Sequence, residues 1–150
     1  MNGNNPVFQI FFQCALDTRE EAYAFISRLA SREERGQKEV NRQLKEREKA
    51  GSLFISEHVI LPHVESQWIQ TSRIIFIRPK RPIVSWNGSN QHVYLLVCVL
   101  LKENESVQIK RKIASFIRAL ADEKLVNRLI NVDEKEKFIQ KIPKIQEGLE

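Results

Sequence analysis

The sequence predicts an α/β fold in which a mixed β-sheet of about five strands is flanked by helices. Short runs rich in β-branched and aromatic residues alternate with segments whose apolar residues recur at helical spacing. The run at residues 92–101 is almost continuously apolar, which is typical of a central strand covered on both faces. No repeat, low-complexity tract or linker divides the 150 residues, so we expect a single domain over residues 1–150.

The beginning of the chain predicts a strand followed by two helices. Residues 7–16 have strand composition, and Thr18 with Glu21 forms a capping box that should start a helix. A more polar helix is expected over residues 37–49, with Gly51 ending it in a left-handed conformation. The apolar stripes expected on the two helices are Ala22, Phe25, Ile26 and Leu29, then Val40 and Leu44.

The middle of the chain predicts the remaining strands. The apolar run at residues 53–61 should form a strand that stops at Pro62, because proline has no amide to donate to a sheet. Residues 74–77 and 82–86 are expected to form further strands, the second followed by a turn at Asn87-Gly88.

The end of the chain predicts three helices. Ser106 can cap a helix whose apolar stripe extends from Ile109 to Leu120. A short helix is expected to begin at Asp122-Glu123, and the last one at Asp133.

Composition indicates a globular protein with a basic surface. The formal net charge is +5, from 24 Lys and Arg against 19 Asp and Glu. That balance permits an anionic partner without requiring one. No run reaches the roughly 18 to 20 apolar residues of a membrane helix, and the N-terminus lacks signal-peptide features, so we expect a cytoplasmic protein. Cys14 and Cys98 lie in apolar runs, and neither has a neighbour at metal-ligand spacing.

His63 is the most informative candidate site residue because it directly follows Pro62 at the expected strand end. An imidazole placed there can be fixed by the sheet, still reach solvent and accept a group near neutral pH. Upstream, Arg47 and Ser52 could supply donors to phosphate oxygens. Each residue also has a simpler interpretation, because a histidine after a strand is commonly an ordinary surface residue. A cation such as Arg47 in the last turn of a helix is favoured by the macrodipole alone.

The other two histidines are expected to be structural. His58 lies five residues before His63, so regular strand geometry would place it on the opposite face. His92 opens the expected central strand and would approach His63 only if the two strand ends coincide.

The chain resembles the EIIA domain of the mannitol/fructose (type-2) class of the bacterial sugar phosphotransferase system. The residues that carry this resemblance are Arg47-Glu48 at a helix end, Ser52, and Pro62-His63. The helix expected over residues 109–120, followed by Asp122-Glu123, keeps the spacing of the family as well. The resemblance therefore covers about the whole chain.

This resemblance implies a type-2 EIIA-like sandwich that relays phosphoryl groups, acting as a phosphotransferase without cofactor or metal. By position, His63 matches the phosphorylated histidine, Arg47 the arginine beside it, and Ser52 the start of the Ser-Thr turn. The implied partners are the phosphocarrier protein HPr, as donor, and an EIIB domain or protein, as acceptor. The second ring nitrogen of His63 must be held by an acceptor, which we expect to be a backbone carbonyl.

The sequence departs from the family in ways that favour an alternative. Ile109 occupies the position where many members have a second active-site histidine. The other departures are Leu53 in the Ser-Thr turn, Ser56 and His58 in place of glycines, and Val64 after the histidine. The alternative is an EIIA-like domain of a sugar-operon transcription regulator, phosphorylated at His63 as a signal and not an enzyme.

Direct nucleic-acid binding is a third and less favoured hypothesis. Basic residues gather at Arg73, Arg78, Lys80 and Arg81 and again at residues 110–112. They lack interleaved exposed aromatic residues and a recognised nucleic-acid motif. The same residues could instead dock the acidic side of a protein partner.

Overall fold

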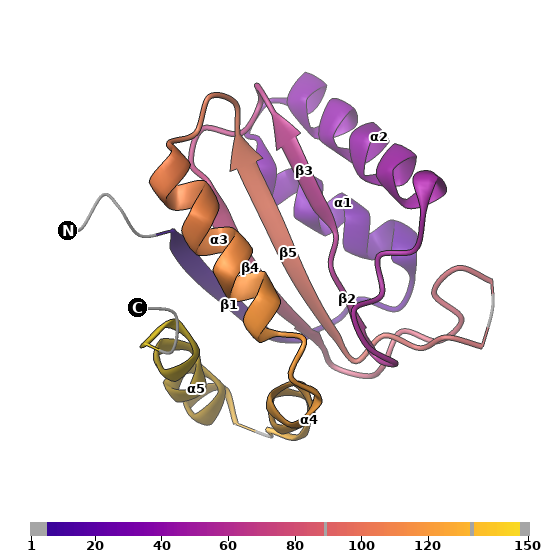
Figure 1. The fold of residues 1–150 in the computed structure, drawn as a ribbon. Helices are drawn as coiled ribbons and strands as arrows, with labels where there is room; N and C mark the ends of the chain where they lie inside the picture. Colours follow the sequence, from indigo (N-terminus) through magenta and orange to yellow (C-terminus); the bar gives the residue numbers. More distant parts are fainter. Residues whose placement is uncertain (1–5, 89, 133, 148–150) are drawn as a thin grey trace. The chain divides into compact units, whose positions relative to one another are not determined.

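The computed structural model describes residues 6–88, 90–132 and 134–147 (Figure 1). Its elements are β1 (Val7–Cys14), α1 (Arg19–Ala30), α2 (Glu34–Ala50), β2 (Val59–Ile60), β3 (His63–Ser66), β4 (Arg73–Pro79), β5 (Leu95–Lys102), α3 (Val107–Ala119), α4 (Glu123–Asn131) and α5 (Lys135–Glu147). Contacts divide the chain into two compact units. One is an α/β unit of residues 7–105, and the other is a helical unit of residues 106–150 with the first six.

The five strands form one mixed sheet, which confirms the predicted fold class. The strand order is β1-β4-β5-β2, and β3 also pairs with β5. Strand β5 is antiparallel to β4 and parallel to β2 and β3, while β1 is parallel to β4. Residues 95–100 of β5 are all buried, as the continuous apolar run predicts for a central strand.

Strands β2 and β3 together form one edge of the sheet, interrupted at Leu61-Pro62. Ile60 pairs with Leu96 before the interruption, and His63 pairs with Val99 after it. The Val99 amide donates to the Pro62 carbonyl at 2.9 Å, while the Leu61 amide donates to the Leu53 carbonyl and proline has no amide hydrogen to donate. An edge position tolerates that loss. A strand thus ends before Pro62, as the sequence predicts, but His63 then begins β3 and is itself paired in the sheet.

Two of the expected strands are largely loops. Residues 53–58 form a tight loop that folds back on the residues after it. The Leu61 amide donates to the Leu53 carbonyl, and the Ile55 amide donates to the Val59 carbonyl, both at 2.9 Å. Within residues 82–86, only Ile83 makes a bridge, to Val93. Leu53 and Ile83 are nevertheless buried, so their apolar side chains indicated burial and not strand pairing.

Helices α1 and α2 begin where local chemistry favours them. The Thr18 hydroxyl accepts from the Glu21 amide at 3.1 Å and caps α1 as predicted. The Glu21 carboxylate accepts from the Thr18 hydroxyl, whereas the capping box predicts that it accepts from the Thr18 amide. Helix α2 begins at Glu34, three residues earlier than expected. Gly51, after α2, has φ 165°, an extended conformation, so the predicted left-handed end of this helix is wrong.

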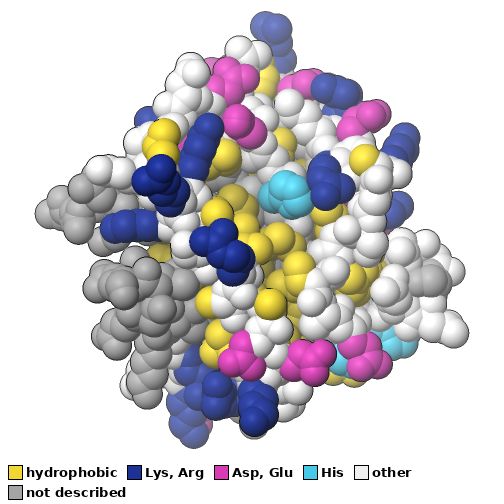
Figure 2. Space-filling model, in the orientation of Figure 1, with side chains coloured by type: hydrophobic (Ala, Val, Ile, Leu, Met, Phe, Trp, Pro, Cys, Tyr) yellow, Lys and Arg dark blue, Asp and Glu magenta, His cyan; other side chains and the backbone are white. Residues whose placement is uncertain are grey.

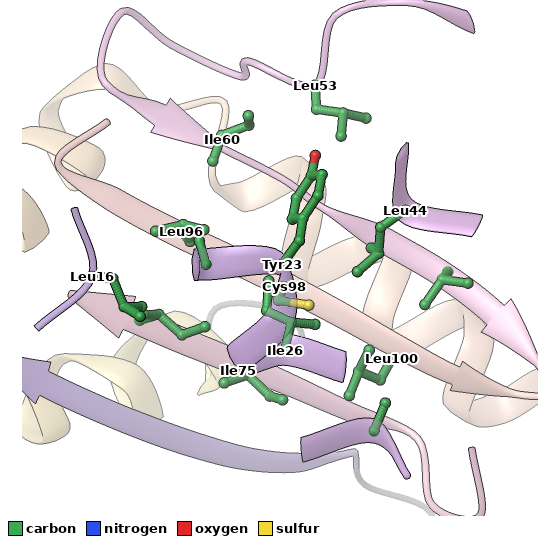
Figure 3. Close-up of a cluster of buried hydrophobic side chains, with 14 of the residues drawn as sticks. Leu16, Tyr23, Ile26, Leu44, Leu53, Ile60, Ile75, Leu96, Cys98 and Leu100 are labelled. Carbon is green, nitrogen blue, oxygen red and sulfur yellow. The ribbon is translucent and has the colours of Figure 1, made fainter. Parts of the chain in front are cut away.

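The core of the α/β unit lies between these two helices and the sheet (Figure 3). Tyr23 and Ile26 of α1 and Leu44 of α2 are fully buried against Ile75 and Leu96 of the sheet. The predicted stripe residues Ala22 and Val40 are also fully buried, while Phe25 and Leu29 pack at the margin of the core.

The helical unit starts as the sequence predicts. The Ser106 hydroxyl caps α3 by accepting from the Ile109 amide at 3.3 Å, and the Asp122 carboxylate caps α4 by accepting from the Lys124 amide at 2.9 Å. Helix α3 contacts α5. Asp133, expected to start the last helix, lies outside the described residues.

Candidate functional site

The imidazole of His63 is fixed by its own chain. Its Nδ1 lies 2.9 Å from the Leu61 carbonyl oxygen, two residues earlier. A carbonyl can only accept, so Nδ1 must carry the proton in this contact. The neutral ring therefore keeps its lone pair on Nε2. This geometry confirms that a backbone carbonyl holds one ring nitrogen, as expected from the sequence.

His63 points away from the core of the α/β unit. The next residue, Val64, is buried in the core cluster with residues of α1 and α2. Because successive side chains of a strand point to opposite faces, the half-buried His63 projects from the other face of the sheet. Figure 2 shows one face of the molecule, on which basic side chains are exposed at several places.

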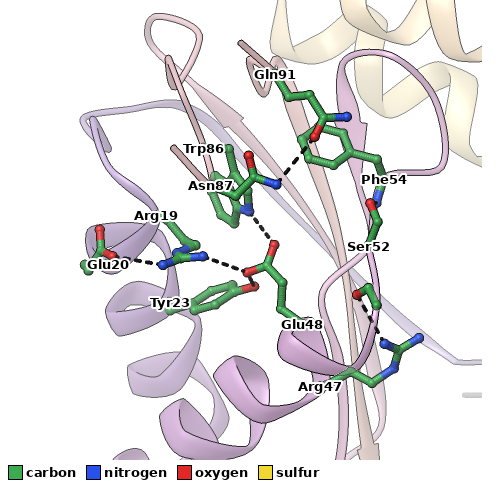
Figure 4. A network of polar contacts seen from close by, with 11 residues as sticks. Arg19, Glu20, Tyr23, Arg47, Glu48, Ser52, Phe54, Trp86, Asn87 and Gln91 are labelled. Carbon is green, nitrogen blue, oxygen red and sulfur yellow. Dashed lines mark hydrogen bonds and ion pairs between the residues drawn. The ribbon is translucent and has the colours of Figure 1, made fainter. Parts of the chain in front are cut away.

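Arg47 and Ser52 lie in the turn that leaves α2. The exposed Arg47 guanidinium is 3.5 Å from the Gly51 carbonyl oxygen, a long contact that leaves most of its donors available. The Ser52 hydroxyl accepts from the Phe54 amide at 3.2 Å, which fixes the turn (Figure 4). The two residues therefore lie close together. Among the described residues, no hydrogen bond joins either of them to His63, although α2 packs against β3.

Glu48, next to Arg47, is turned inward. One carboxylate oxygen accepts from the Tyr23 hydroxyl at 2.6 Å, and the other accepts from the Trp86 indole nitrogen at 2.7 Å (Figure 4). Arg19 lies 3.5 Å from the first oxygen. Burial, and then the hydrogen bond to Glu48, raises the pKa of Tyr23 far above its usual value, so the phenol stays a donor.

The Glu48 network was not foreseen from the sequence. Its donors come from α1 and from the loop between β4 and β5, 25 and 38 residues away along the chain. The one sequence feature that could have indicated this network is Glu48 itself. A carboxylate in the last turn of a helix is disfavoured by the macrodipole, so it needs other partners.

The other two histidines have structural contacts. The imidazole Nδ1 of His92 accepts from the Ser85 amide at 3.1 Å, and His58 lies against the Tyr94 ring with centroids 4.2 Å apart. These contacts agree with the structural interpretation of His58 and His92.

Ile109, at the position of the family's second histidine, lies in the first turn of α3 and is half-buried.

The basic residues near β4 are partly engaged in the fold. Arg73 is half-buried and donates to the Leu29 carbonyl at 2.7 Å, and Arg78 lies over the Phe12 ring. Burial lowers the pKa of Arg73. Arg73 therefore links the sheet to the end of α1, which counts against its use in nucleic-acid binding.

Within the described ranges, no cluster of three or more His, Cys, Asp or Glu side chains could hold a metal ion. The described helices include none that is long and apolar enough to cross a membrane.

Comparison with known proteins identifies one family. The family model described as "Phosphoenolpyruvate-dependent sugar phosphotransferase system, EIIA 2" matches residues 7–145. No curated protein sequence matches significantly.

Solved structures share the fold at low sequence identity. The nitrogen regulatory protein IIA-Ntr from Neisseria meningitidis superposes with a TM-score of 0.70 and 19% identity, covering 97% of this chain and 96% of that one. The mannitol IIA protein from Escherichia coli gives a TM-score of 0.64 and 19% identity over 94% and 97% of the two chains. The complex of mannitol enzyme IIA with phosphorylated enzyme IIB, also from Escherichia coli, gives 0.63 and 17% identity over 99% and 97%.

Proposed function

Because the chain belongs to the EIIA 2 family of the phosphoenolpyruvate-dependent sugar phosphotransferase system, we propose that it accepts a phosphoryl group on His63 and passes it on. The donor in this proposal is phosphorylated HPr and the acceptor is an EIIB domain or protein, so the protein would act in the cytoplasm. The observation that carries the proposal is the contact between His63 Nδ1 and the Leu61 carbonyl. This contact leaves Nε2 as the free nucleophile.

The chemistry follows from this tautomer. The Nε2 lone pair forms a bond to phosphorus, and the bond from phosphorus to the donor's histidine nitrogen breaks, with the electron pair leaving on that nitrogen. Nδ1 keeps its proton, so the phosphorylated ring carries a positive charge that the Leu61 carbonyl stabilises. Phosphoryl transfer depends mainly on such positioning and on charge stabilisation.

Arg47 and Ser52 are the proposed phosphate-binding residues. Arg47 is exposed, its guanidinium is a planar fork of N–H donors, and its contact to the Gly51 carbonyl is long. The guanidinium can therefore leave the turn to meet phosphoryl oxygens with two parallel donors. Ser52 in the same turn can donate its hydroxyl hydrogen while its oxygen still accepts from Phe54.

The test is incubation with enzyme I, HPr and phosphoenolpyruvate, followed by measurement of acid-labile phosphate on the protein. We expect labelling of the wild type, complete loss in His63→Ala, and retention in the control variants His58→Ala and His92→Ala. Phosphorus NMR should place the label on Nε2. An unlabelled wild type, or a labelled His63→Ala, would refute the proposal.

A regulatory role is the second candidate, and the observation that favours it is Ile109. The family resemblance places a second active-site histidine at this position, and isoleucine cannot donate to a phosphoryl group. In that case His63 would be phosphorylated as a signal, and the group would not move to any EIIB. Transfer from the phosphorylated protein to an EIIB panel separates the two roles.

A further inference from the structure

The carboxylate of Glu48 ties together three segments beside the proposed site. It receives hydrogen bonds from Tyr23 in α1 at 2.6 Å and from Trp86 in the β4–β5 loop at 2.7 Å. Arg19 approaches at 3.5 Å, and the Glu48 side chain is only 11% exposed. The rings of Tyr23 and Trp86 also pack edge to face, with centroids 5.5 Å apart.

Stability alone is a poor explanation for an acid at this position. Glu48 lies in the last turn of α2, where the negative end of the helix dipole disfavours a carboxylate. Removing a charge from water also costs free energy, which nearby donors offset only in part. A buried group that opposes its local environment often marks a functional requirement.

The position of Glu48 along the chain indicates what that requirement is. Arg47 is the preceding residue, and Gly51 and Ser52 follow three and four residues later. The glycine is extended and a Cβ there would meet no atom within 4 Å, so Gly51 itself adds no packing to the turn. The bonds from Tyr23 and Trp86 to Glu48 therefore add polar anchors at the end of α2 to the apolar ones that the buried Leu44 and Leu53 provide.

We propose that Glu48 is a positioning residue for phosphoryl acceptance, which fixes the end of α2 from which Arg47 and Ser52 meet the phosphoryl group. This inference rests on the proposed function at His63. Glu48 does not touch the phosphoryl group in this proposal. It acts through the placement of the neighbouring Arg47 guanidinium.

The test compares Glu48→Gln with Glu46→Gln, a matched loss of one carboxylate at an exposed position two residues earlier. A glutamine has one acceptor oxygen, so its amide group would face one of the two donors, Tyr23 or Trp86. We expect Glu48→Gln to lower the single-turnover rate at saturating phosphorylated HPr by about 10- to 100-fold, with an unchanged KM. Glu46→Gln should react like the wild type.

A double-mutant cycle distinguishes positioning from a general structural role. If Glu48 acts through Arg47, Glu48→Gln should cause little further loss in an Arg47→Ala background. A wild-type rate in Glu48→Gln, or the same fold-loss with and without Arg47, would overturn the inference. Should Glu48→Gln fail to fold, Tyr23→Phe removes one donor with the ring retained, and a wild-type rate in that folded variant would also overturn it.

Failure of this inference differs from failure of the proposed function. If the wild type itself takes no phosphate on His63, the proposed function is wrong and the rates of the variants have no meaning. If the wild type is labelled and Glu48→Gln reacts equally fast, only the role of Glu48 is wrong.

Discussion

At the scale of single residues, the local chain decides which atom of His63 can react. The Leu61 carbonyl lies two residues back, on the other side of Pro62, and fixes the proton on Nδ1. No residue from another element is needed for this tautomer. The proposed nucleophile is thus a property of the Leu61-Pro62-His63 segment, whereas phosphate binding depends on α2.

Replacement of Arg47 tests whether phosphate binding depends on α2. Arg47 is exposed and makes one long contact, so Arg47→Ala should leave the melting temperature unchanged. The rate of phosphoryl acceptance should fall by about 100-fold, as expected when a charged donor to the transition state is removed. Arg47→Lys keeps the charge but loses the paired donors, and we expect an intermediate rate. Equal rates in all three proteins would show that Arg47 does not bind the phosphoryl group.

How far the site could be predicted depends on the range of its contacts. Arg47, Ser52 and His63 were proposed through the family resemblance that residues 47–63 carry, and the need for an acceptor at His63 followed from imidazole chemistry. Tyr23 and Trp86 were missed as partners of Glu48 because their approach depends on the tertiary fold.

At the scale of elements, two glycines of α2 have opposite roles, Gly36 in its first turn and Gly51 directly after its last residue. A Cβ on Gly36 would lie 2.2 Å from the Ser31 hydroxyl oxygen and 2.9 Å from Trp68 Cε3. A Cβ on Gly51 would meet nothing within 4 Å, and the extended backbone there suits any residue. Gly36 therefore permits close packing between α2 and its neighbours, whereas the backbone at position 51 does not require a glycine.

Alanine at these two positions should separate the roles. We expect Gly36→Ala to lower the free energy of unfolding by about 1–3 kcal/mol, because overpacking outweighs the helical preference of alanine. Gly51→Ala should be neutral or stabilising by up to about 1 kcal/mol, through the entropy of the unfolded chain. Urea denaturation of both variants measures this difference. A destabilised Gly51→Ala would argue for a left-handed helix end after all.

The elements show why periodicity predicts helices better than short strands. Capping residues and apolar stripes located α1, α3 and α4, because these signals act within one or two turns. The runs at residues 53–61 and 82–86 had strand composition, yet Leu53, Ile83 and Trp86 contribute to the core from loops. Burial and strand pairing favour the same side chains, so composition alone could not distinguish them.

At the scale of the whole molecule, the mixed sheet has a central strand without polar side chains from residue 95 to 101. Cys98 lies in the middle of this strand, opposite Ile75 of β4. Burial raises the pKa of its thiol to about 12, from an ordinary value near 9. Any opening that exposes this thiol must disrupt the centre of the sheet.

Alkaline pH should therefore destabilise the protein through Cys98. Because the pKa is higher in the folded state, the stabilisation is complete below about pH 9 and is lost as the pH rises toward about 12. In the unfolded chain the thiol ionises first, so by pH 11 the free energy of unfolding should fall by up to about 3 kcal/mol from this group. Urea denaturation between pH 7 and 11 measures the loss. Cys98→Ala should be less stable at pH 7, because a cavity replaces the sulfur, but its stability should fall less steeply above pH 9. Parallel curves for the two proteins would show that the thiol is not the titrating group.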